Sequence, residues 1–490
     1  MNKKTIIKGT LYVSVVSAIL ALQSCAPQSN YKAPKLDLPE QFRGQVDSLN
    51  TAKDSVGIAD IDWKAFFEDE KLINLIDRGL ENNFDMTNAI KNIQIADQKA
   101  RQAKLEWLPT VDMTLGNVGY QYKSSNYYGS PSSAYYKKKG KDAPENMYVN
   151  SAQHISDISI SWELDIWGKM RSMSAEALAN YLKTHEAKKA VQTALIANIA
   201  EGYYNLLLLD AQMEVAQSNY ELTKNTLKIV ELQRDAGQTT SLAIQQTRNQ
   251  MLVAKALIPS LKQQIAIQEN SLSLLTGQLP DAVERDTKLA DVKYEETLTT
   301  GVPLYLVSQR PDVQQAELEL KAKNARVGVA QTNRYPSLTI DVTGGLNSML
   351  GKNWFNIPGS LFGGIIGELS APLFNKRKLK TDFEVAKIER EKAEIDLQKS
   401  VYGAITEVSD ALITLETVKE QIEIAEEQVA TSRLGVKQSN LLFNSGYANY
   451  IEIINAQKNM LDSELNLNKL KQNKLISRVK LYKALGGGWK

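Results

Sequence analysis

The sequence predicts a mainly α-helical protein with a smaller β-strand part, in which one strand-and-helix unit is used twice. Two long segments, residues 170–233 and 377–443, contain no proline and very little glycine, which is typical of long helices. Segments that alternate apolar and polar residues precede each of them, as in strands with one apolar face. Matching motifs also recur in the two halves of the chain at a nearly constant offset, which indicates an internal repeat.

The repeat is visible in two pairs of motifs. The first long segment begins at Ser161–Lys169 and the second at Leu369–Lys376, so that Lys376 lies 207 residues after Lys169. Near the far ends, Gly237 and Gly446 lie 209 residues apart in similar short motifs. A strand followed by a long helix, used twice, predicts a symmetric wall around an axis rather than a ligand pocket.

Each long segment predicts a helical rod that reverses near its glycine and returns as a second helix. A single helix of about 65 residues would span roughly 100 Å, which no single globular domain buries. In the second rod, apolar residues recur at steps of three and four, which predicts a coiled-coil seam. The return helices are expected at 239–275 and 448–484, and Pro259 is expected to kink or interrupt the first of them.

The alternating segments leave two structures open. Ile158, Ile160 and Trp162 alternate with polar residues, and Leu338 and Ile340 do the same. Such strands suit either a half-buried soluble sheet or a barrel with lipid outside and water inside. Four strands cannot close a barrel around a channel, and a membrane strand cannot leave an open edge in lipid. A barrel would therefore need several chains in cyclic symmetry.

The N-terminus predicts export. Lys3, Lys4 and Lys8 precede a short apolar run, which is typical of a secretory signal covering residues 1–24. Cys25 is the only cysteine, so the chain cannot form an internal disulfide. The segment before it resembles a bacterial lipobox, which would make Cys25 the lipidated first residue of the mature protein. An ordinary signal with a coincidental cysteine is the alternative. The signal and the lipobox favour the barrel over the soluble sheet.

Composition excludes several classes of protein. Residues 1–24 contain three lysines and no acid, so the mature chain carries 55 basic against 56 acidic residues. This balance argues against a nucleic-acid-binding protein. After residue 24 the sequence has no apolar run long enough for a transmembrane helix, so any crossing of a bilayer would use β-strands.

At this point the chain resembles the TolC/OprM-like outer-membrane efflux proteins, in their NodT-type lipoprotein branch. Four blocks carry the resemblance, and they run over nearly the whole mature chain: Trp63–Phe67, Trp162–Lys169, Arg310–Val313 with Tyr335–Leu338, and Tyr482–Trp489. The resemblance implies a homotrimer in the outer membrane of a Gram-negative bacterium. Each chain would give four strands to one twelve-stranded barrel and four helical strands to a coiled-coil tunnel in the periplasm.

The expected organisation follows from these observations. It comprises a lipoprotein signal (1–24), an extended lipid-anchored leader (25–61), a first repeat (62–280), an equatorial connector (281–309) and a second repeat (310–490). Each repeat would hold a leading helix, a β-hairpin (109–167 or 336–374) and a helical hairpin (170–275 or 377–484).

The resemblance implies that the protein is the passive exit duct of a tripartite efflux system for drugs or other small toxic compounds. Its partners would be a periplasmic adaptor, a proton-driven inner-membrane pump and outer-membrane lipids. Two alternatives remain open: the duct of an ATP-driven peptide or protein secretion system, and a structural coiled-coil surface protein. The sequence does not identify the exported substrate.

The tips of the helical hairpins are the candidate functional site. The segment from Gly446 matches the family's tip motif, and by that match Ile451 and Asn455 face the axis near the closed end, with Glu452 beside them as a possible source of charge. Three copies would form a gating ring. Ile451 could instead be a coiled-coil core residue.

Four further residues lie at the turns, where adaptor contact is expected: Arg234, Gly237, Asn444 and Gly446. They could equally serve only to reverse the helices, because glycine relieves backbone strain there.

No catalytic or metal-binding constellation is present. The only histidines, His154 and His185, are far apart in the sequence and have no cysteine at metal-ligand spacing. The run Gly486–Gly488 follows a predicted helix and is a stop rather than a phosphate-binding loop. We therefore expect no enzyme activity, no metal and no cofactor.

Overall fold

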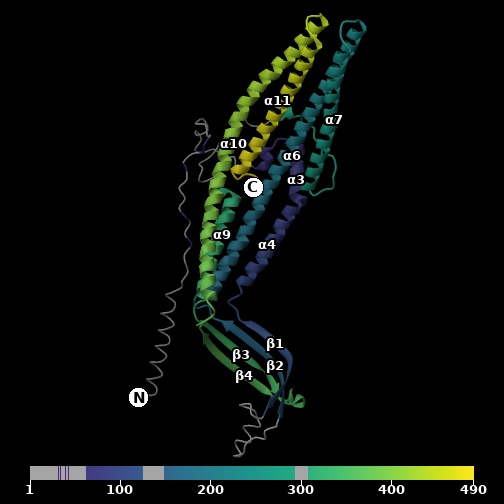
Figure 1. Ribbon diagram of the computed structural model, residues 1–490. Coiled ribbons are helices and arrows are strands. Elements are labelled where there is room, and N and C mark those ends of the chain that lie inside the picture. The colour runs from purple at the N-terminus through teal and green to yellow at the C-terminus, as the bar shows by residue number, and fades with distance from the viewer. Residues whose placement is uncertain are drawn as a thin grey trace, which may run out of the picture. The chain divides into compact units, whose positions relative to one another are not determined.

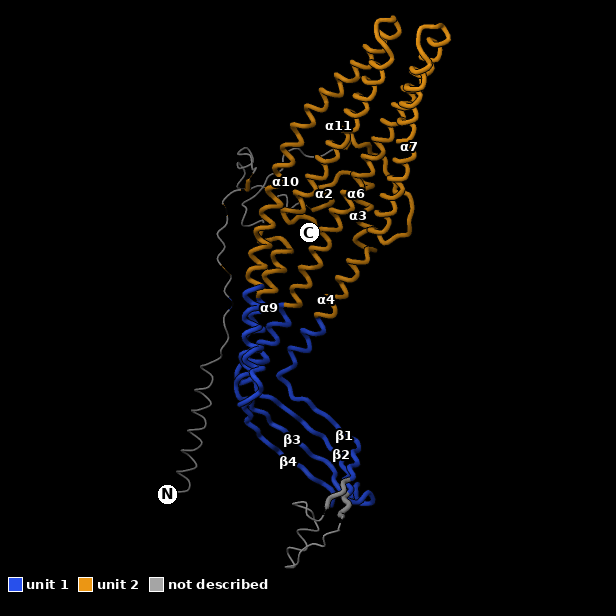
Figure 2. Tube along the Cα trace, in the orientation of Figure 1, with its two compact units in different colours: residues 1–32, 97–179, 321–392 blue, residues 33–96, 180–320, 393–490 orange. Residues whose placement is uncertain are grey.

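The computed structural model describes residues 31, 34, 39, 42–43, 62–124, 148–292 and 307–489 (Figure 1). The predicted signal, the lipidation site Cys25 and nearly all of the leader lie outside the described residues. The chain divides into two compact units (Figure 2). The first comprises residues 1–32, 97–179 and 321–392, and the second comprises 33–96, 180–320 and 393–490.

A four-stranded antiparallel sheet dominates the first unit. Its strands are β1 (Thr110–Ser124), β2 (Tyr148–Glu163), β3 (Ser337–Ser348) and β4 (Leu361–Ser370), and they are paired in that order. The two strands at the centre, β2 and β3, come from different halves of the sequence. The strands predicted from alternation at Ile158–Trp162 and at Leu338–Ile340 pair directly, with Ile160 opposite Val342.

Among the described residues, the two outer strands each have one edge without a partner. Since neighbouring strands in the order β1-β2-β3-β4 are hydrogen-bonded, these are the outer edges of β1 and β4. The pairing of β1 with β2 shifts register between Thr114 and Asn117, which marks a bulge. Apolar side chains on both outer strands are exposed, among them Val111 and Met113 on β1 and Ile365 and Leu369 on β4.

Close helix packing completes the first unit. The end of α9 (Pro311–Thr332) contacts the start of α6 (Lys169–Asp235) and of α10 (Lys378–Asn444). A side chain at Gly328 would lie 2.8 Å from the hydroxyl oxygen of Ser172, so a larger residue there would force the Ser172 side chain to shift. Val327, Ala330 and Ala386 form the small apolar core there.

The second unit is built from helices. It contains α2 (Trp63–Phe66), α3 (Glu70–Asn82), most of α4 (Phe84–Ala103), α7 (Ser241–Leu275), the short η3 (Leu289–Asp291), α11 (Tyr450–Ala484) and the longer parts of α6 and α10. Its densest core follows α6, where Ile196, Ile199, Tyr203 and Leu206 are fully buried. Tyr203 donates a hydrogen bond of 2.9 Å to Asp69, whose carboxylate also caps α3.

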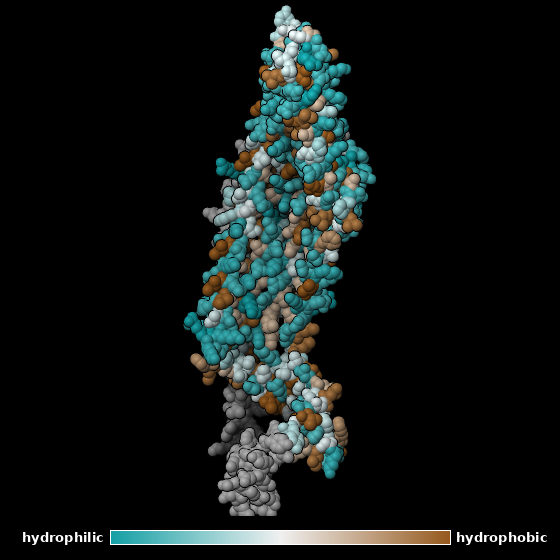
Figure 3. Space-filling model, turned by 45° about the vertical axis from the view of Figure 1, so that its right-hand side comes forward, coloured by the Kyte–Doolittle hydropathy of each residue, from teal (hydrophilic) through white to brown (hydrophobic). Residues whose placement is uncertain are grey.

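The long helices form two antiparallel hairpins, which lie side by side at their tips (Figure 1). In the first, α6 has 67 residues and α7 has 35; in the second, α10 has 67 and α11 has 35. None of the described helices is both long enough and apolar enough to cross a membrane. Hydrophilic residues cover most of the helical surface visible in Figure 3, with hydrophobic residues scattered among them.

Pro259 does not interrupt α7, which runs unbroken from Ser241 to Leu275. The expectation of an interruption was therefore wrong, and a kink at Pro259 stays a prediction. Pro259 lies on the exposed side of the helix, together with Lys255. The carbonyl four residues earlier, which loses its amide donor, therefore lies where water can reach it.

Candidate functional site

The two helical hairpins reverse through the same backbone geometry. Gly237 and Gly446 both have left-handed φ angles, +73° and +80°. The residue after each glycine closes the helix end, because its backbone amide donates a 2.8 Å hydrogen bond to the carbonyl five residues earlier. These hydrogen bonds run from Gln238 to Gln233 and from Tyr447 to Leu442. This is the usual glycine-terminated helix end. Glycine is thus required by backbone conformation at both turns, independently of any partner.

The predicted adaptor-contact residues all lie at these exposed turns. Arg234 occupies the last turn of α6 and pairs with the neighbouring Asp235 at 2.7 Å. Asn444 ends α10 and is exposed. A side chain at either glycine would have nothing within 4 Å. The tips are therefore open surfaces within one chain.

Asn449 positions the predicted gate residues at the start of α11. Its carboxamide oxygen accepts hydrogen bonds from the amides of Ile451 (2.9 Å) and Glu452 (3.3 Å), so it caps the helix. Ile451 is 46% exposed, whereas Ile453 is completely buried. Glu452 and Asn455 are also exposed. Within the chain, Ile453 rather than Ile451 is the core residue, and the three predicted gate residues lie on accessible faces of the first two turns.

An apolar cluster joins the two tips beneath these residues. It contains Leu227 and Val230 of α6, Ala243 and Ile244 of α7, Phe443 of α10 and Ile453 of α11. Because every long helix contributes to it, the cluster fixes the tips against each other. Its residues were not singled out from the sequence, where they are indistinguishable from other seam positions.

Three hydrogen-bonded contacts between uncharged side chains link the hairpins along one face of α11. Tyr450 donates to Gln246 of α7 at 2.7 Å, and Gln457 donates to Thr226 of α6 at 2.8 Å. Further along, Gln472 donates to Asn205 at 3.1 Å.

Asn205 extends the third contact by donating to Gln268 of α7 at 2.8 Å. Each hairpin also contains ion pairs between its own two helices, as in Arg248–Glu231 and Arg433–Glu464. The three contacts named between the hairpins are therefore neutral, whereas contacts within the hairpins include ion pairs as well as neutral hydrogen bonds.

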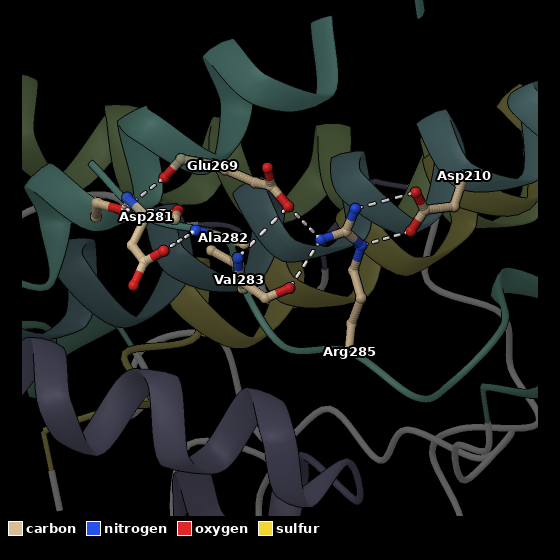
Figure 4. A network of polar contacts seen from close by, with 7 residues as sticks. Asp210, Glu269, Asp281, Ala282, Val283 and Arg285 are labelled. Carbon is tan, nitrogen blue, oxygen red and sulfur yellow. Dashed lines mark hydrogen bonds and ion pairs between the residues drawn. The ribbon is translucent and has the colours of Figure 1, made fainter. Parts of the chain in front are cut away.

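Arg285 fastens the described part of the connector to the first hairpin (Figure 4). Its guanidinium donates hydrogen bonds to both carboxylate oxygens of Asp210 on α6. It also donates one from Nη1 to Oε1 of Glu269 on α7, at 2.6 Å. The hydrogen bonds that Arg285 donates to the Asp210 carboxylate raise the pKa of Arg285 despite its burial. Lys71 of α3 pairs with Glu284, and Lys288 pairs with Glu214 of α6. The connector is thus held across three helices by charge.

Arg310, directly after the connector, fastens the start of α9 to the second hairpin. It is only 7% exposed and bonds Asp312 at the start of α9, Glu407 of α10 (2.7 Å) and the carbonyl of Ala484 at the end of α11 (2.7 Å). Burial by itself would lower the pKa of Arg310, but its carboxylate partners outweigh this and raise it. Asp312 is half-buried, and its partial loss of solvation would raise its pKa, but Arg310 lowers the pKa overall.

The described residues hold no group of three or more His, Cys, Asp or Glu side chains that could bind a metal ion. His154 contacts the ring of Trp354 in the first unit, and His185 contacts the ring of Tyr181 in the second.

Comparisons with known proteins agree with this architecture. A family profile described as "Outer membrane efflux protein" matches residues 75–278 and 305–487. The cation efflux system protein CusC of Escherichia coli O6:H1 is 27% identical over 472 residues, covering 96% of this chain and 97% of that protein. The probable outer membrane lipoprotein SilC of Salmonella typhimurium is 26% identical over 484 residues, covering 98% of each. The crystal structure of the Campylobacter jejuni CmeC outer membrane channel superposes with a TM-score of 0.83 at 20% identity, covering 95% of each chain.

The fold of the chain is that of the superposed outer membrane channel. The chain belongs to the outer membrane efflux protein family, because the profile covers most of its length. It is the outer-membrane channel component of an efflux system.

Proposed function

We propose that three copies of this chain form one passive duct, with a twelve-stranded barrel in the outer membrane. The observation that supports this proposal is the pair of unpaired edges on β1 and β4. Every backbone amide and carbonyl in lipid needs a partner, so an open edge is excluded there. Pairing β4 of one copy with β1 of the next closes the ring, and cyclic symmetry makes all three junctions identical.

The helical hairpins form the periplasmic tunnel in this proposal, and the chain consists of two duplicated halves. The equal lengths of α6 and α10, and of α7 and α11, support the duplication. So do the matched glycine turns at Gly237 and Gly446. The repeats span 62–280 and 310–490, joined by the connector 281–309, with the leader 25–61 in front.

Removal of residues 1–24 and acylation of Cys25 anchor the mature chain to the outer membrane. The relative SilC is named a lipoprotein, which supports this assignment. Acyl chains add about 0.8 kcal/mol for each buried methylene, so the anchor supplements the barrel rather than replacing it. Intact mass of the purified protein tests the assignment: a diacylated or triacylated Cys25 is expected, and a mature chain without added mass would contradict it.

The tips form the gate, with Ile451, Glu452 and Asn455 arranged as rings around the axis. Their exposure within one chain leaves them free to face a water-filled lumen. The neutral contacts at Tyr450 and Gln457 hold the second hairpin against the first in the closed state. An adaptor opens the duct by binding the open state better than the closed one.

The adaptor contacts the exposed turns at Arg234, Gly237, Asn444 and Gly446, and a proton-driven inner-membrane pump supplies small toxic compounds. CusC is named a cation efflux protein, so cations are one substrate class for this duct. Selection among substrates lies mainly with the pump, because a duct makes few specific contacts.

Conductance in planar bilayers, with mass by light scattering, tests the duct and its gate. A trimer with small openings is expected, and alanine at Ile451 and Asn455 should enlarge them. Alanine at Lys419 and Lys437, which are exposed on α10 away from the turn, serves as the matched control. If conductance is unchanged in the gate variants as well as in the control variants, the assignment of the gate residues is contradicted. Rescue of a strain that lacks only an ATP-driven secretion duct would support the secretion alternative.

A further inference from the structure

The two strand-to-helix junctions of the chain differ in charge. At the first junction, Lys169 at the start of α6 pairs with both oxygens of Glu163, at 3.0 and 2.9 Å. Asp165 accepts hydrogen bonds from the amides of Met170 (3.0 Å) and Arg171 (3.2 Å). A helix N-terminus carries partial positive charge, and carboxylates stabilise it. The first junction therefore supplies its own anionic partners.

The second junction, between β4 and α10, lacks such anionic partners. The residues 207 positions after Glu163 and Asp165 are Ser370 and Pro372, and the first turn of α10 contains no acid. Cations gather there instead, all of them exposed: Lys376, Arg377, Lys378 and Lys380. Among the described residues none of these four side chains has an ion pair. Four cations therefore lie together beside the positive end of a helix, where their mutual repulsion favours the binding of an anion.

Exposed apolar side chains directly precede these cations. Leu373 is 98% exposed and Phe374 is 88% exposed, between the end of β4 and the start of α10. An aromatic residue lies near the helix-side end of each strand: Trp107, Trp167, Tyr335 and Phe374. Aromatic rings at strand ends, followed by cations, are typical of the boundary between a bilayer and water.

We propose that the segment Leu373–Lys380 binds the anionic headgroups of phospholipids in the periplasmic leaflet of the outer membrane. The cations contact lipid phosphates, while Leu373 and Phe374 enter the boundary of the acyl chains. This inference rests on the proposed function, because it requires β4 to lie in the membrane. Each cation near an anionic lipid surface adds roughly a fivefold gain in binding, so four of them make a strong preference.

Charge complementarity favours lipid over a second copy of the chain as the occupant. In the proposed trimer, β4 pairs with the neighbour's β1, and the segment before that β1 runs from Lys104 to Leu108. That segment contains one base and one acid, Lys104 and Glu106, so it cannot neutralise four cations. The carboxylates of Glu163 and Asp165 are already engaged by the start of α6.

The test is lipid binding by the full-length chain in detergent, followed by native mass spectrometry. Dioleoyl phosphatidylglycerol is titrated against dioleoyl phosphatidylethanolamine, with inorganic phosphate as a competitor. The variant K376Q/R377Q/K378Q/K380Q removes the junction charge. Its matched control, K228Q/K419Q/K437Q/K458Q, removes four exposed cations from the helical hairpins. A third variant, K376R/K378R/K380R, retains the charge.

We expect the junction variant to bind phosphatidylglycerol at least about tenfold more weakly, with phosphatidylethanolamine unchanged. The control and the arginine variant should bind both lipids like the parent chain, and millimolar phosphate should not compete.

Equal phosphatidylglycerol binding by junction and control variants would overturn the proposal. So would competition by phosphate, which would indicate a free-anion site, or loss of the trimer in the junction variant alone, which would indicate an interface between copies. Conductance of the parent chain is measured separately, so failure of the lipid preference and failure of the duct are distinguishable.

Discussion

The two helical hairpins share one backbone plan but are held in different ways. Both pair a 67-residue helix with a 35-residue helix and turn at a left-handed glycine. The first contains the deepest core, around Ile199 and Leu206, and the charged connector fastens it through Arg285. The second exposes apolar side chains along α10, such as Ile395 and Ile424, and contacts the first through neutral hydrogen bonds.

In the proposed duplication and gate, this difference shows how one repeated unit can supply both a fixed and a movable part. Ion pairs with buried partners hold geometry tightly, whereas a neutral hydrogen bond contributes only about 0.5–1.5 kcal/mol. Moving the second hairpin would break neutral hydrogen bonds and the apolar cluster at the tips but no ion pair described between the hairpins, whereas moving the whole first hairpin would also break the Arg285 network. The exposed apolar residues of α10 are consistent with a face that neighbouring copies cover in the proposed trimer.

The largest expected effect comes from Arg310, which fixes the base of the second hairpin. Arg310→Ala removes contacts to Asp312, Glu407 and the Ala484 carbonyl together, and should cost about 2–4 kcal/mol of unfolding free energy. The measurement is the unfolding midpoint in detergent. Arg326→Ala, which breaks an exposed pair at 3.8 Å from Glu176, is the control and should change little. Equal midpoints for the two variants would contradict a special role for Arg310.

A smaller loss of stability is expected at the first hairpin. Arg285→Ala leaves Asp210 and Glu269 without their shared partner and should cost about 1–3 kcal/mol, because Asp210 stays partly solvated. Single-channel conductance should remain unchanged, since the network lies far along the hairpin from the gate residues. Lys288→Ala removes an exposed pair on the same connector and should lie within about 0.5 kcal/mol of the parent chain. A rise in conductance in Arg285→Ala would mean that the first hairpin also moves.

Loss of a single neutral contact should loosen the tip without unfolding it. Tyr450→Phe removes the 2.7 Å hydrogen bond to Gln246 and should raise the open probability about two- to tenfold, as a bond of about 0.5–1.5 kcal/mol implies. Planar-bilayer recording measures this. Tyr447→Phe is the matched control, because that side chain is exposed at the same tip. If both variants gate like the parent chain, the neutral contacts do not hold the closed state.

The smallest effect is a pH dependence at Asp312. Its pKa is lowered in the folded chain, so its contribution to stability is present above the unfolded pKa near 3.8 and is lost as pH falls through the lower folded value. Asp312→Asn should therefore lose about 1 kcal/mol or less at neutral pH and little below about pH 3. Unfolding midpoints across pH 2–7 measure this. In an Arg310→Ala background the substitution should have no such pH dependence; if the dependence persists there, Arg310 is not its cause.

The features that follow from local sequence could be predicted, and those that join distant segments could not. The left-handed conformation of Gly237 and Gly446 follows from glycine at the end of a long helix, and the strand around Ile158–Trp162 follows from alternation. The partners of Tyr450 and Gln457 lie more than 200 residues away. Nothing in the local pattern distinguishes them from other polar residues on long helices.

Packing within one chain bears on two features of the sequence. Ile451 could be a core residue, but within one chain the helix cap at Asn449 turns Ile453 into the apolar cluster and leaves Ile451 exposed, and its role as a gate residue stays a prediction. Pro259 could have broken α7, but its exposed position lets the helix continue. In both cases the residue type allows more than one local structure, and the position of the residue relative to the other helices of the chain determines which of them forms.

The central claim is that three copies form one duct closed at the tips of the second hairpins. Single-channel conductance of the purified protein, together with its mass, tests this most directly. A trimer whose openings are small in the parent chain and larger in Tyr450→Phe and in alanine variants at Ile451 and Asn455 is the predicted result. A monomer, or a trimer whose conductance is the same in all of these variants, would contradict the account.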